Sequence, residues 1–197
     1  MYKRIYTPLT EEQVSNLQAG DQVLITGKIY SARDAAHKRM AEALGLGESL
    51  PFDPKGQLIY YAGPCPAKPG YAAGPFGPTT SGRMDKYAPA IIAQGLKGMM
   101  GKGDRTGEVV AAMKAHHCVY FAAIGGLGAY TATVIKSIKT VAYEDLGAEA
   151  IRELEVEDFP AIVAIDCRGN NLYKTEPQKY KDQFEEIIQS RSKDETE

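Results

Sequence analysis

The chain contains few of the residues that most directly reveal a chemistry. Its 197 residues include three cysteines, three histidines and no tryptophan. The cysteines, at positions 65, 118 and 167, are too few and too scattered for a disulfide framework or a paired-cysteine zinc site. No apolar run approaches the roughly 20 residues of a membrane-spanning helix, and the start, MYKRIYTPLTEEQ, lacks the apolar stretch of a signal peptide. These absences predict a reduced, cytoplasmic protein without a membrane partner.

The chain also lacks an excess of charge of either sign. Lysine and arginine number 23 against 25 acidic residues, so the formal net charge is −2 and nothing indicates a nucleic-acid partner. With 44% hydrophobic residues, the composition is that of a folded globular protein. We expect a single domain over residues 1–190 and a disordered tail over residues 191–197.

Charge is missing from one long segment rich in glycine and proline. Between Gln57 and Gly82 the only charged residue is Lys68. Flexible linkers are usually polar, so this segment predicts ordered loops packed against another surface, such as a partner subunit. A charge introduced at Phe76 is therefore expected to weaken association with that partner.

The remaining chain reads as alternating helices and strands. Thr10 and Gln13 have the spacing of a capping box at the start of a helix. Further helices are expected over residues 33–44, capped by Ser31, and over residues 107–117 and 180–192, with a turn that enters a helix within 78–95. Strands are expected over residues 21–31, 56–63, 96–103, 118–126, 137–145 and 159–169. This interleaving predicts the α/β class.

The first candidate site is the run SARDAAHKR, residues 31–39. Arg33 and His37 are four residues apart, so on a helix they share one face. A guanidinium in the first helical turn does not suit the helix dipole, but an anionic ligand there would explain it. The alternative is a solvated basic helix face that includes Lys38 and Arg39.

The second candidate is GPTTSGRMD, residues 77–85. Three hydroxyl residues and an arginine at a predicted helix start would form a cradle for an anion, although a single helix cap would also use one hydroxyl. Lys102 lies between two glycines after a predicted strand; it is either a site residue or an exposed turn lysine. Cations around hydroxyls would suit a small dicarboxylate, yet no strong acid–base pair or metal-ligand set accompanies them. The sequence therefore predicts half of an active site.

These motifs carry a resemblance to a known family. In order along the chain, TGKIYSARDAAHKR, IYYAGP, GPTTSGRMD, GKG and DCRGNNLY resemble the β subunit of class I, iron–sulfur-dependent fumarate hydratase. The L(+)-tartrate dehydratase β subunit is related, and the resemblance extends from about Thr7 to Tyr173. Tartrate dehydratase β chains tend to read CRDxCH where this chain reads ARDAAH, which favours fumarate hydratase.

The resemblance implies a three-layer, swivelling β/β/α domain that acts only with a separate α subunit, in an α2β2 assembly. That α subunit would hold a 4Fe–4S cluster through its own cysteines, and this chain alone would bind no metal. The implied reaction is the reversible dehydration of (S)-malate to fumarate. Tartrate, mesaconate or another small dicarboxylate remains an alternative substrate, and a stand-alone anion-binding module is the alternative from a different class.

The resemblance also assigns roles to individual residues. Arg33, Arg83 and Lys102 would clamp the substrate carboxylates. Thr79 would be the base at C3, although a neutral hydroxyl is a poor base without help from nearby cations. His37 would be a catalytic residue or would orient its neighbours. The amides of three further residues would complete the cradle: Thr80, Ser81 and Gly82.

Overall fold

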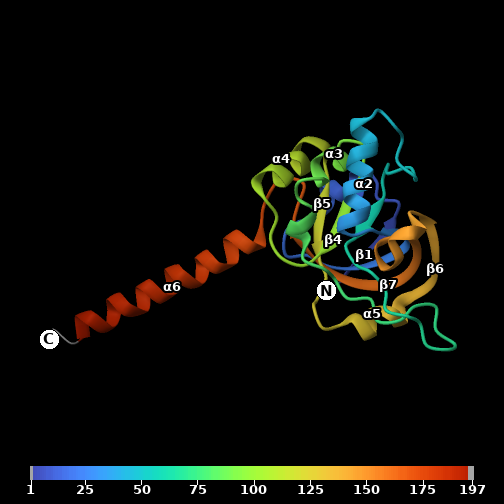
Figure 1. The fold of residues 1–197 in the computed structure, drawn as a ribbon. Helices are drawn as coiled ribbons and strands as arrows, with labels where there is room; N and C mark the ends of the chain where they lie inside the picture. The colour runs from blue at the N-terminus through green and yellow to red at the C-terminus, as the bar shows by residue number, and fades with distance from the viewer. Residues whose placement is uncertain (1, 195–197) are drawn as a thin grey trace.

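The computed structural model describes residues 2–194, in which seven strands form one sheet. The strand order is β1-β2-β3-β4-β5-β7-β6 (Figure 1). The bounds are β1 (Lys3–Thr7), β2 (Gln22–Ser31), β3 (Leu58–Tyr60), β4 (Gly98–Gly101), β5 (Val119–Ala122), β6 (Ile135–Ala142) and β7 (Ile151–Ile165). This mixture of strands with intervening helices confirms the α/β class, whereas the three-layer swivelling arrangement stays a prediction.

Strands β1 to β5 run parallel to one another, and β7 runs antiparallel to each of its neighbours, β2, β5 and β6. Strand β7 pairs with β5 and also with β2, so the strands β2, β3, β4, β5 and β7 close into a ring. The carboxyl ends of the parallel strands β2, β3 and β4 therefore lie at one end of this ring.

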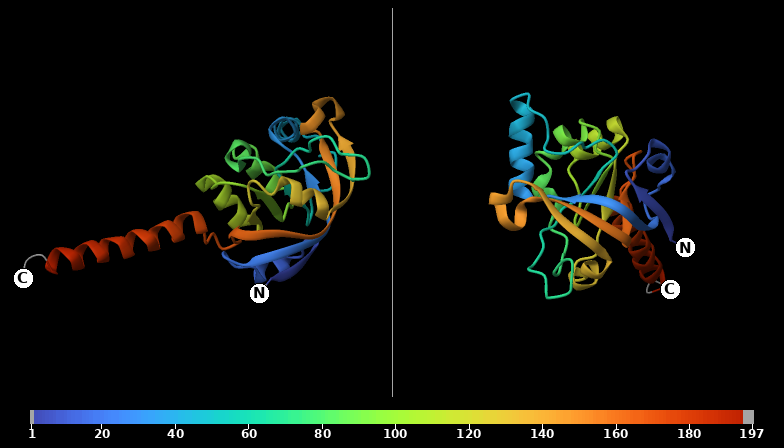
Figure 2. Two further views of the ribbon diagram at one scale, coloured as in Figure 1. Left: turned by 90° about the horizontal axis from the view of Figure 1, so that it is seen from below. Right: turned by 90° about the vertical axis from the view of Figure 1, so that its right-hand side faces the viewer.

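Alternation of side chains along the strands creates two hydrophobic cores. Tyr60 and Met100 point into one core, whereas Ile59, Tyr61 and Met99 point into the other. Helices α2 (Asp34–Gly45), α3 (Ala88–Ile92) and α4 (Gly107–His116) cover the second core. In Figure 2 these helices gather on one side of the molecule, and the long curved strands lie on the other. Helices α1 (Glu11–Asn16) and α5 (Gly128–Val134) contribute to the first core.

The helix starts show which local signals the sequence contains. The capping box of Thr10 and Gln13 forms as predicted. The predicted cap of α2 is wrong, because Ser31 is the buried last residue of β2 and Arg33 occupies the N-cap position. The Arg33 side chain makes no capping hydrogen bond. The Glu149 carboxylate instead accepts a hydrogen bond of 2.8 Å from the Ala35 amide in the first turn of the helix.

Two strands are only partly predicted from the sequence. Strand β1 was not expected, and β7 begins at Ile151 rather than near residue 159. The last helix, α6 (Leu172–Asp194), extends away from the body (Figure 1). The expected tail starts within α6, and residues 195–197 lie outside the described part of the chain. Among the helices of residues 2–194, none is long and apolar enough to cross a membrane.

Candidate functional site

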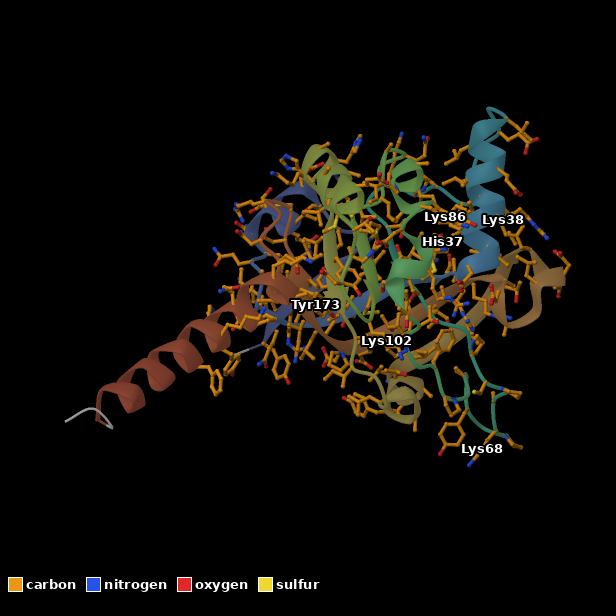
Figure 3. The ribbon with its side chains drawn as sticks, turned by 60° about the vertical axis from the view of Figure 1, so that its left-hand side comes forward. His37, Lys38, Lys68, Lys86, Lys102 and Tyr173 are labelled. Carbon is orange, nitrogen blue, oxygen red and sulfur yellow. The ribbon has the colours of Figure 1, made fainter. Side chains whose placement is uncertain are left out.

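The predicted site residues lie where parallel strands end. Arg33 follows β2 within two residues, and Lys102 follows β4 directly. In open α/β sheets, ligands bind at the carboxyl ends of the strands, because loops there converge while the sheet holds them in place. Figure 3 labels Lys102 at this end of the sheet and His37 on α2.

The GPTTSGRMD motif lies alongside Lys102 through backbone hydrogen bonds. The Thr79 amide donates to the Tyr61 carbonyl at 2.7 Å, which attaches the motif to the end of β3. The Lys102 amide donates to the Thr79 carbonyl at 3.2 Å, and the Ser81 amide donates to the Lys102 carbonyl at 2.8 Å. Thr79 and Lys102, 23 positions apart in the printed sequence, are therefore neighbours.

Asp34 links the two arginines of the site. One oxygen of its carboxylate forms an ion pair with Arg83 Nε at 2.5 Å. The other oxygen lies 3.8 Å from Arg33 Nε. Arg33 Nη2 also lies 3.6 Å from Glu149. The Nε atom of Arg33 is buried without a hydrogen-bond partner, so the guanidinium retains unused donor capacity. An anionic ligand at this surface would compete with Asp34 for the two arginines.

Arg33 depends on a glycine for its position. A Cβ at Gly63 would lie 3.2 Å from Arg33 Cδ and 2.6 Å from the Ala148 carbonyl oxygen. Only a residue without a side chain therefore allows the loop after β3 to pass this closely beneath the guanidinium.

His37 is buried and faces the protein interior. Its Nδ1 lies 2.9 Å from the Arg33 carbonyl oxygen, so the neutral imidazole can donate to that oxygen. Burial lowers the pKa of His37 to about 4, and the Arg105 guanidinium acts in the same direction, against the Arg33 carbonyl that favours the charged form. The ring contacts Tyr61 edge-on at 5.0 Å between centroids. His37 is thus neutral at pH 7 and linked to the backbone of Arg33.

Lys38 and Arg39, in contrast, belong to the solvated face of α2. Lys38 pairs with Glu42 at 3.7 Å, and Arg39 makes two bonds to Asp145 at 2.7 and 2.8 Å. The alternative of a solvated basic helix face therefore describes these two residues and leaves Arg33 and His37 for the site.

Ser81 differs from the expectation. It is fully buried, and its Oγ lies 2.8 Å from the Tyr120 hydroxyl while its amide is bonded to Lys102. Neither group can bind a ligand without breaking a buried hydrogen bond. The segment Ser81–Met84 is also a single turn of 3-10 helix rather than the start of an α-helix. The cradle is therefore formed by its links to Tyr61 and Lys102, and the amides of Thr80 and Gly82 are the ones left to face a ligand.

The site is an open surface. The side chain of Arg83 is 52% exposed and that of Arg33 is 24% exposed, and Thr80, Gly82 and Lys102 are exposed as well. Small-molecule sites usually enclose most of their ligand. A second surface would have to cover this one for a small dicarboxylate to be buried.

The described part of the chain offers no obvious metal ligands. Among the side chains that the structure describes, no group of three histidine, cysteine, aspartate or glutamate residues lies together so that it could hold a metal ion. Cys65 is exposed, and Cys118 and Cys167 are buried. Burial raises the pKa of Cys118 to about 12, so this thiol stays protonated.

Several residues of the site were not singled out as site residues from the sequence. Asp34 and Asp85 stand inside the quoted motifs, but their partners Arg33, Arg83 and Arg105 are known only from the structure. Tyr61 also stands inside a quoted motif, IYYAGP, which assigned it no role. Three more such residues lie outside the quoted motifs, namely Glu149, Tyr120 and Arg105.

Together these features define an α/β domain that presents cations and a hydroxyl at the carboxyl ends of parallel strands. The family described as Fumarase C-terminus matches residues 3–176. The chain belongs to this family.

Known relatives extend the comparison. Over 164 residues the chain is 43% identical to "Fumarate hydratase class I, aerobic" of Escherichia coli K12, a match that covers 82% of this chain and 30% of that protein. It is 42% identical to "Fumarate hydratase 2" of Leishmania major, with coverage of 82% and 29%. It is 38% identical over 189 residues to "Putative L(+)-tartrate dehydratase subunit beta" of Methanocaldococcus jannaschii, with coverage of 93% and 97%. The chain thus spans about 30% of the length of these two fumarate hydratases and nearly all of the archaeal subunit.

Proposed function

We propose that this chain is the β subunit of a class I fumarate hydratase, which interconverts (S)-malate with fumarate and water together with an α subunit. One observation carries the proposal. Arg33 and Arg83 flank the Asp34 carboxylate, and Thr79 is bonded through its backbone to Lys102, in a chain of the Fumarase C-terminus family.

The three cations bind the two carboxylates of the substrate. Arg33 and Arg83 already share the Asp34 carboxylate, so they lie close enough to act on one carboxylate or on neighbouring ones. Planar guanidinium groups suit this task because they can donate two parallel hydrogen bonds to a carboxylate. Lys102, at the carboxyl end of β4, supplies the charge for the other carboxylate.

Thr79 acts as the base at C3: its hydroxyl first loses its own proton to solvent, and the resulting alkoxide takes up the proton that leaves C3 of malate. Its backbone bond to Lys102 keeps a cation close, and that charge lowers the cost of a developing alkoxide. We assign His37 a positioning role rather than a catalytic one, since it is buried, neutral and bonded to the Arg33 carbonyl.

A 4Fe–4S cluster completes the site from the α subunit, in an α2β2 assembly. When bound, the cluster acts as a Lewis acid toward the C2 hydroxyl and makes it a better leaving group. The thiols of this chain do not fit as ligands, because Cys118 and Cys167 are buried and exposed Cys65 belongs to no group of three candidate metal ligands among the side chains that the structure describes. The chain's own part is to bind the carboxylates and to handle the C3 proton.

A related hydroxydicarboxylate is the second candidate substrate. The relative that this chain covers to 97% of its length is named as a tartrate dehydratase subunit beta. It is a β subunit, as we propose for this chain. The same three cations would bind L(+)-tartrate, so the choice depends on the α subunit that closes the site.

The decisive experiment produces this chain together with its α partner under exclusion of oxygen. Fumarate absorbance is followed with (S)-malate, while L(+)-tartrate and mesaconate are assayed in parallel. Interconversion of malate and fumarate that needs both chains supports the proposal; activity confined to tartrate selects the second candidate. A cluster-loaded complex without any hydro-lyase activity contradicts both.

The site assignment is tested by Arg83→Ala in that complex. Loss of a desolvated charge-assisted contact costs about 2–5 kcal/mol, or roughly 30- to several-thousand-fold in kcat/KM. Arg4→Ala is the matched control, because Arg4 is an exposed arginine that pairs with Asp158 at 2.6 Å, away from the site. Near-equal rates for wild type and Arg83→Ala would contradict the assignment.

The α subunit covers the uncharged surface next to the site. The predicted probe for this surface, Phe76, is fully buried, so a charge there would damage the core instead of reporting on association. Tyr71 is 60% exposed in the same segment, and Lys68 lies at the tip of this loop in Figure 3. Tyr71→Asp should weaken co-purification of the α subunit, whereas Tyr2→Asp, at another exposed tyrosine, should not. Equal recovery with both variants would place the interface elsewhere.

The swivelling β/β/α arrangement would let the whole domain move against that partner.

A further inference from the structure

A buried arginine lies beneath the anion cradle. The side chain of Arg105 is 0% exposed, and its guanidinium carbon lies 5.3 Å from the ring centre of Tyr61 and 5.1 Å from that of Tyr120. Its Nε donates to Asp85 at 2.7 Å, and the second Asp85 oxygen accepts the Thr106 amide at 2.7 Å. A buried ion pair is costly and is often no more stable than an apolar replacement. The pair therefore invites an explanation beyond stability.

Each of the two tyrosines holds one part of the cradle. Tyr61 accepts the Thr79 amide at its carbonyl, and its own amide donates to Met100 at 2.7 Å in β4. The Tyr120 hydroxyl donates to the Gly103 carbonyl at 2.9 Å and lies 2.8 Å from Ser81 Oγ, whose proton it can accept. The two tyrosines whose rings contact Arg105 are thus linked to both sides of the Thr79–Lys102 pair, Tyr61 through its backbone carbonyl and Tyr120 through its hydroxyl.

A third link leads from Tyr61 to Arg33. The Tyr61 ring contacts His37 edge-on, and His37 is bonded to the Arg33 carbonyl oxygen. Burial raises the pKa of both Tyr61 and Tyr120, so both rings remain neutral phenols that can stack on a cation. One buried guanidinium is therefore in contact with both tyrosines from which these links lead to Thr79, Lys102 and Arg33.

We propose that Arg105 is a positioning residue, which fixes the distance between Thr79, Lys102 and Arg33 without touching the substrate. The proposal rests on the proposed function for its activity readout only. A planar guanidinium suits the role because both faces can lie against aromatic rings while the edge bonds Asp85. It also explains the last residue of the GPTTSGRMD motif, since Asp85 binds the buried charge and no ligand.

The test uses Tyr120→Phe, which removes one hydroxyl and retains the ring. The matched control is Tyr60→Phe, because the Tyr60 hydroxyl is also buried and donates to a backbone carbonyl, that of Phe76 at 2.7 Å, but on the other core. Amide hydrogen exchange is measured on the isotope-labelled full chain, and kcat and KM for (S)-malate are measured on the complex with the α subunit.

Tyr120→Phe should speed exchange of the Ser81 and Lys102 amides by roughly tenfold or more, since it leaves buried polar groups unpaired. It should raise KM for malate by about tenfold with a smaller change in kcat, as expected when ground-state carboxylate contacts are lost. Tyr60→Phe should change neither quantity at these positions. Unchanged exchange and unchanged KM in folded Tyr120→Phe would overturn the proposal.

Arg105 itself is tested by Arg105→Lys and Arg105→Met. Lysine keeps the charge beside Asp85 but cannot stack on both rings, so it should recover part of the affinity that Arg105→Met loses. Equal KM values for wild type and Arg105→Met would also overturn the proposal. If Arg105→Met does not fold, Tyr120→Phe alone decides. If the wild-type complex does not turn over malate, the proposed function fails, and the exchange data still decide the positioning role.

Discussion

Gly101 offers the sharpest test of how closely the cradle is packed. A Cβ built on this glycine would lie 2.1 Å from Ser81 Oγ, 3.1 Å from Tyr61 Cδ2 and 3.4 Å from the Thr79 carbonyl oxygen. The backbone of Gly101 does not have a positive φ, so alanine would be excluded by contact and not by conformation. Gly101→Ala therefore acts directly on the attachment of Ser81.

The magnitude follows from what Ser81 must give up. Overpacking a buried site costs about 1–3 kcal/mol. If the Ser81 hydroxyl rotates away to make room, it leaves the Tyr120 hydroxyl, and an unpaired buried hydroxyl costs about 1–3 kcal/mol more. A combined loss of about 2–6 kcal/mol is a large part of the roughly 5–15 kcal/mol that stabilises a typical domain.

Urea unfolding measures this loss. With a slope of about 2 kcal/mol per molar urea, the midpoint of Gly101→Ala should fall by roughly 1–3 M. Gly107→Ala is the control, because a Cβ there meets no atom within 4 Å. Adding Ser81→Ala removes the atom that clashes. The double variant should therefore lose less unfolding free energy than the two single variants lose in sum. An unchanged midpoint for Gly101→Ala, or strictly additive losses, would refute the reasoning.

Three further outcomes are expected. The pKa of His37 is about 4 in the folded chain against 6.5 for a free histidine, so between these pH values the unfolded chain binds a proton that the folded chain does not. The free energy of unfolding should therefore fall by about 3 kcal/mol as the pH drops from 6.5 to 4. A His37→Gln variant with the same pH profile as the wild type would contradict this. Gly63→Ala should push Arg33 aside and raise KM for (S)-malate in the complex, and an unaltered KM would show that the loop can yield. A thiol reagent should modify the native chain once, at exposed Cys65, because Cys118 is buried and protonated; mass spectrometry of the labelled peptides identifies the site, and rapid labelling of Cys118 would contradict the structure.

Local signals in the sequence were sufficient for much of the site. The order of strand, glycine and lysine around Lys102 predicted its place after β4 correctly, and the four-residue spacing of Arg33 and His37 placed both on α2 or at its start. These predictions succeeded because each depends on a few consecutive residues, whose spacing fixes their relative direction.

The remaining features depend on contacts between distant segments. Glu149 contacts Arg33 and the start of α2 although it is distant from them in the sequence. No residue near Arg33 in the sequence predicts this contact. Arg105 stands in GDRTG as an ordinary charged residue, and only the packing of β3 and β5 around it shows that it is buried. The first half of β7 alternates buried and charged positions, a weaker signal than the apolar run that follows it.

The ring of strands has a consequence for how the protein is made. Residues 22–31 cannot find their antiparallel partner until residues 151–165 have left the ribosome, because β7 is the last strand in sequence and the one that closes the ring. Pairing of such distant segments slows folding, since a long loop must be ordered before its contacts form. Until then the apolar residues of β2 and β5 lack their cover. A nascent chain that pauses before β7 would be a substrate for chaperones, and premature termination there would yield a fragment without either a closed sheet or a supported anion site.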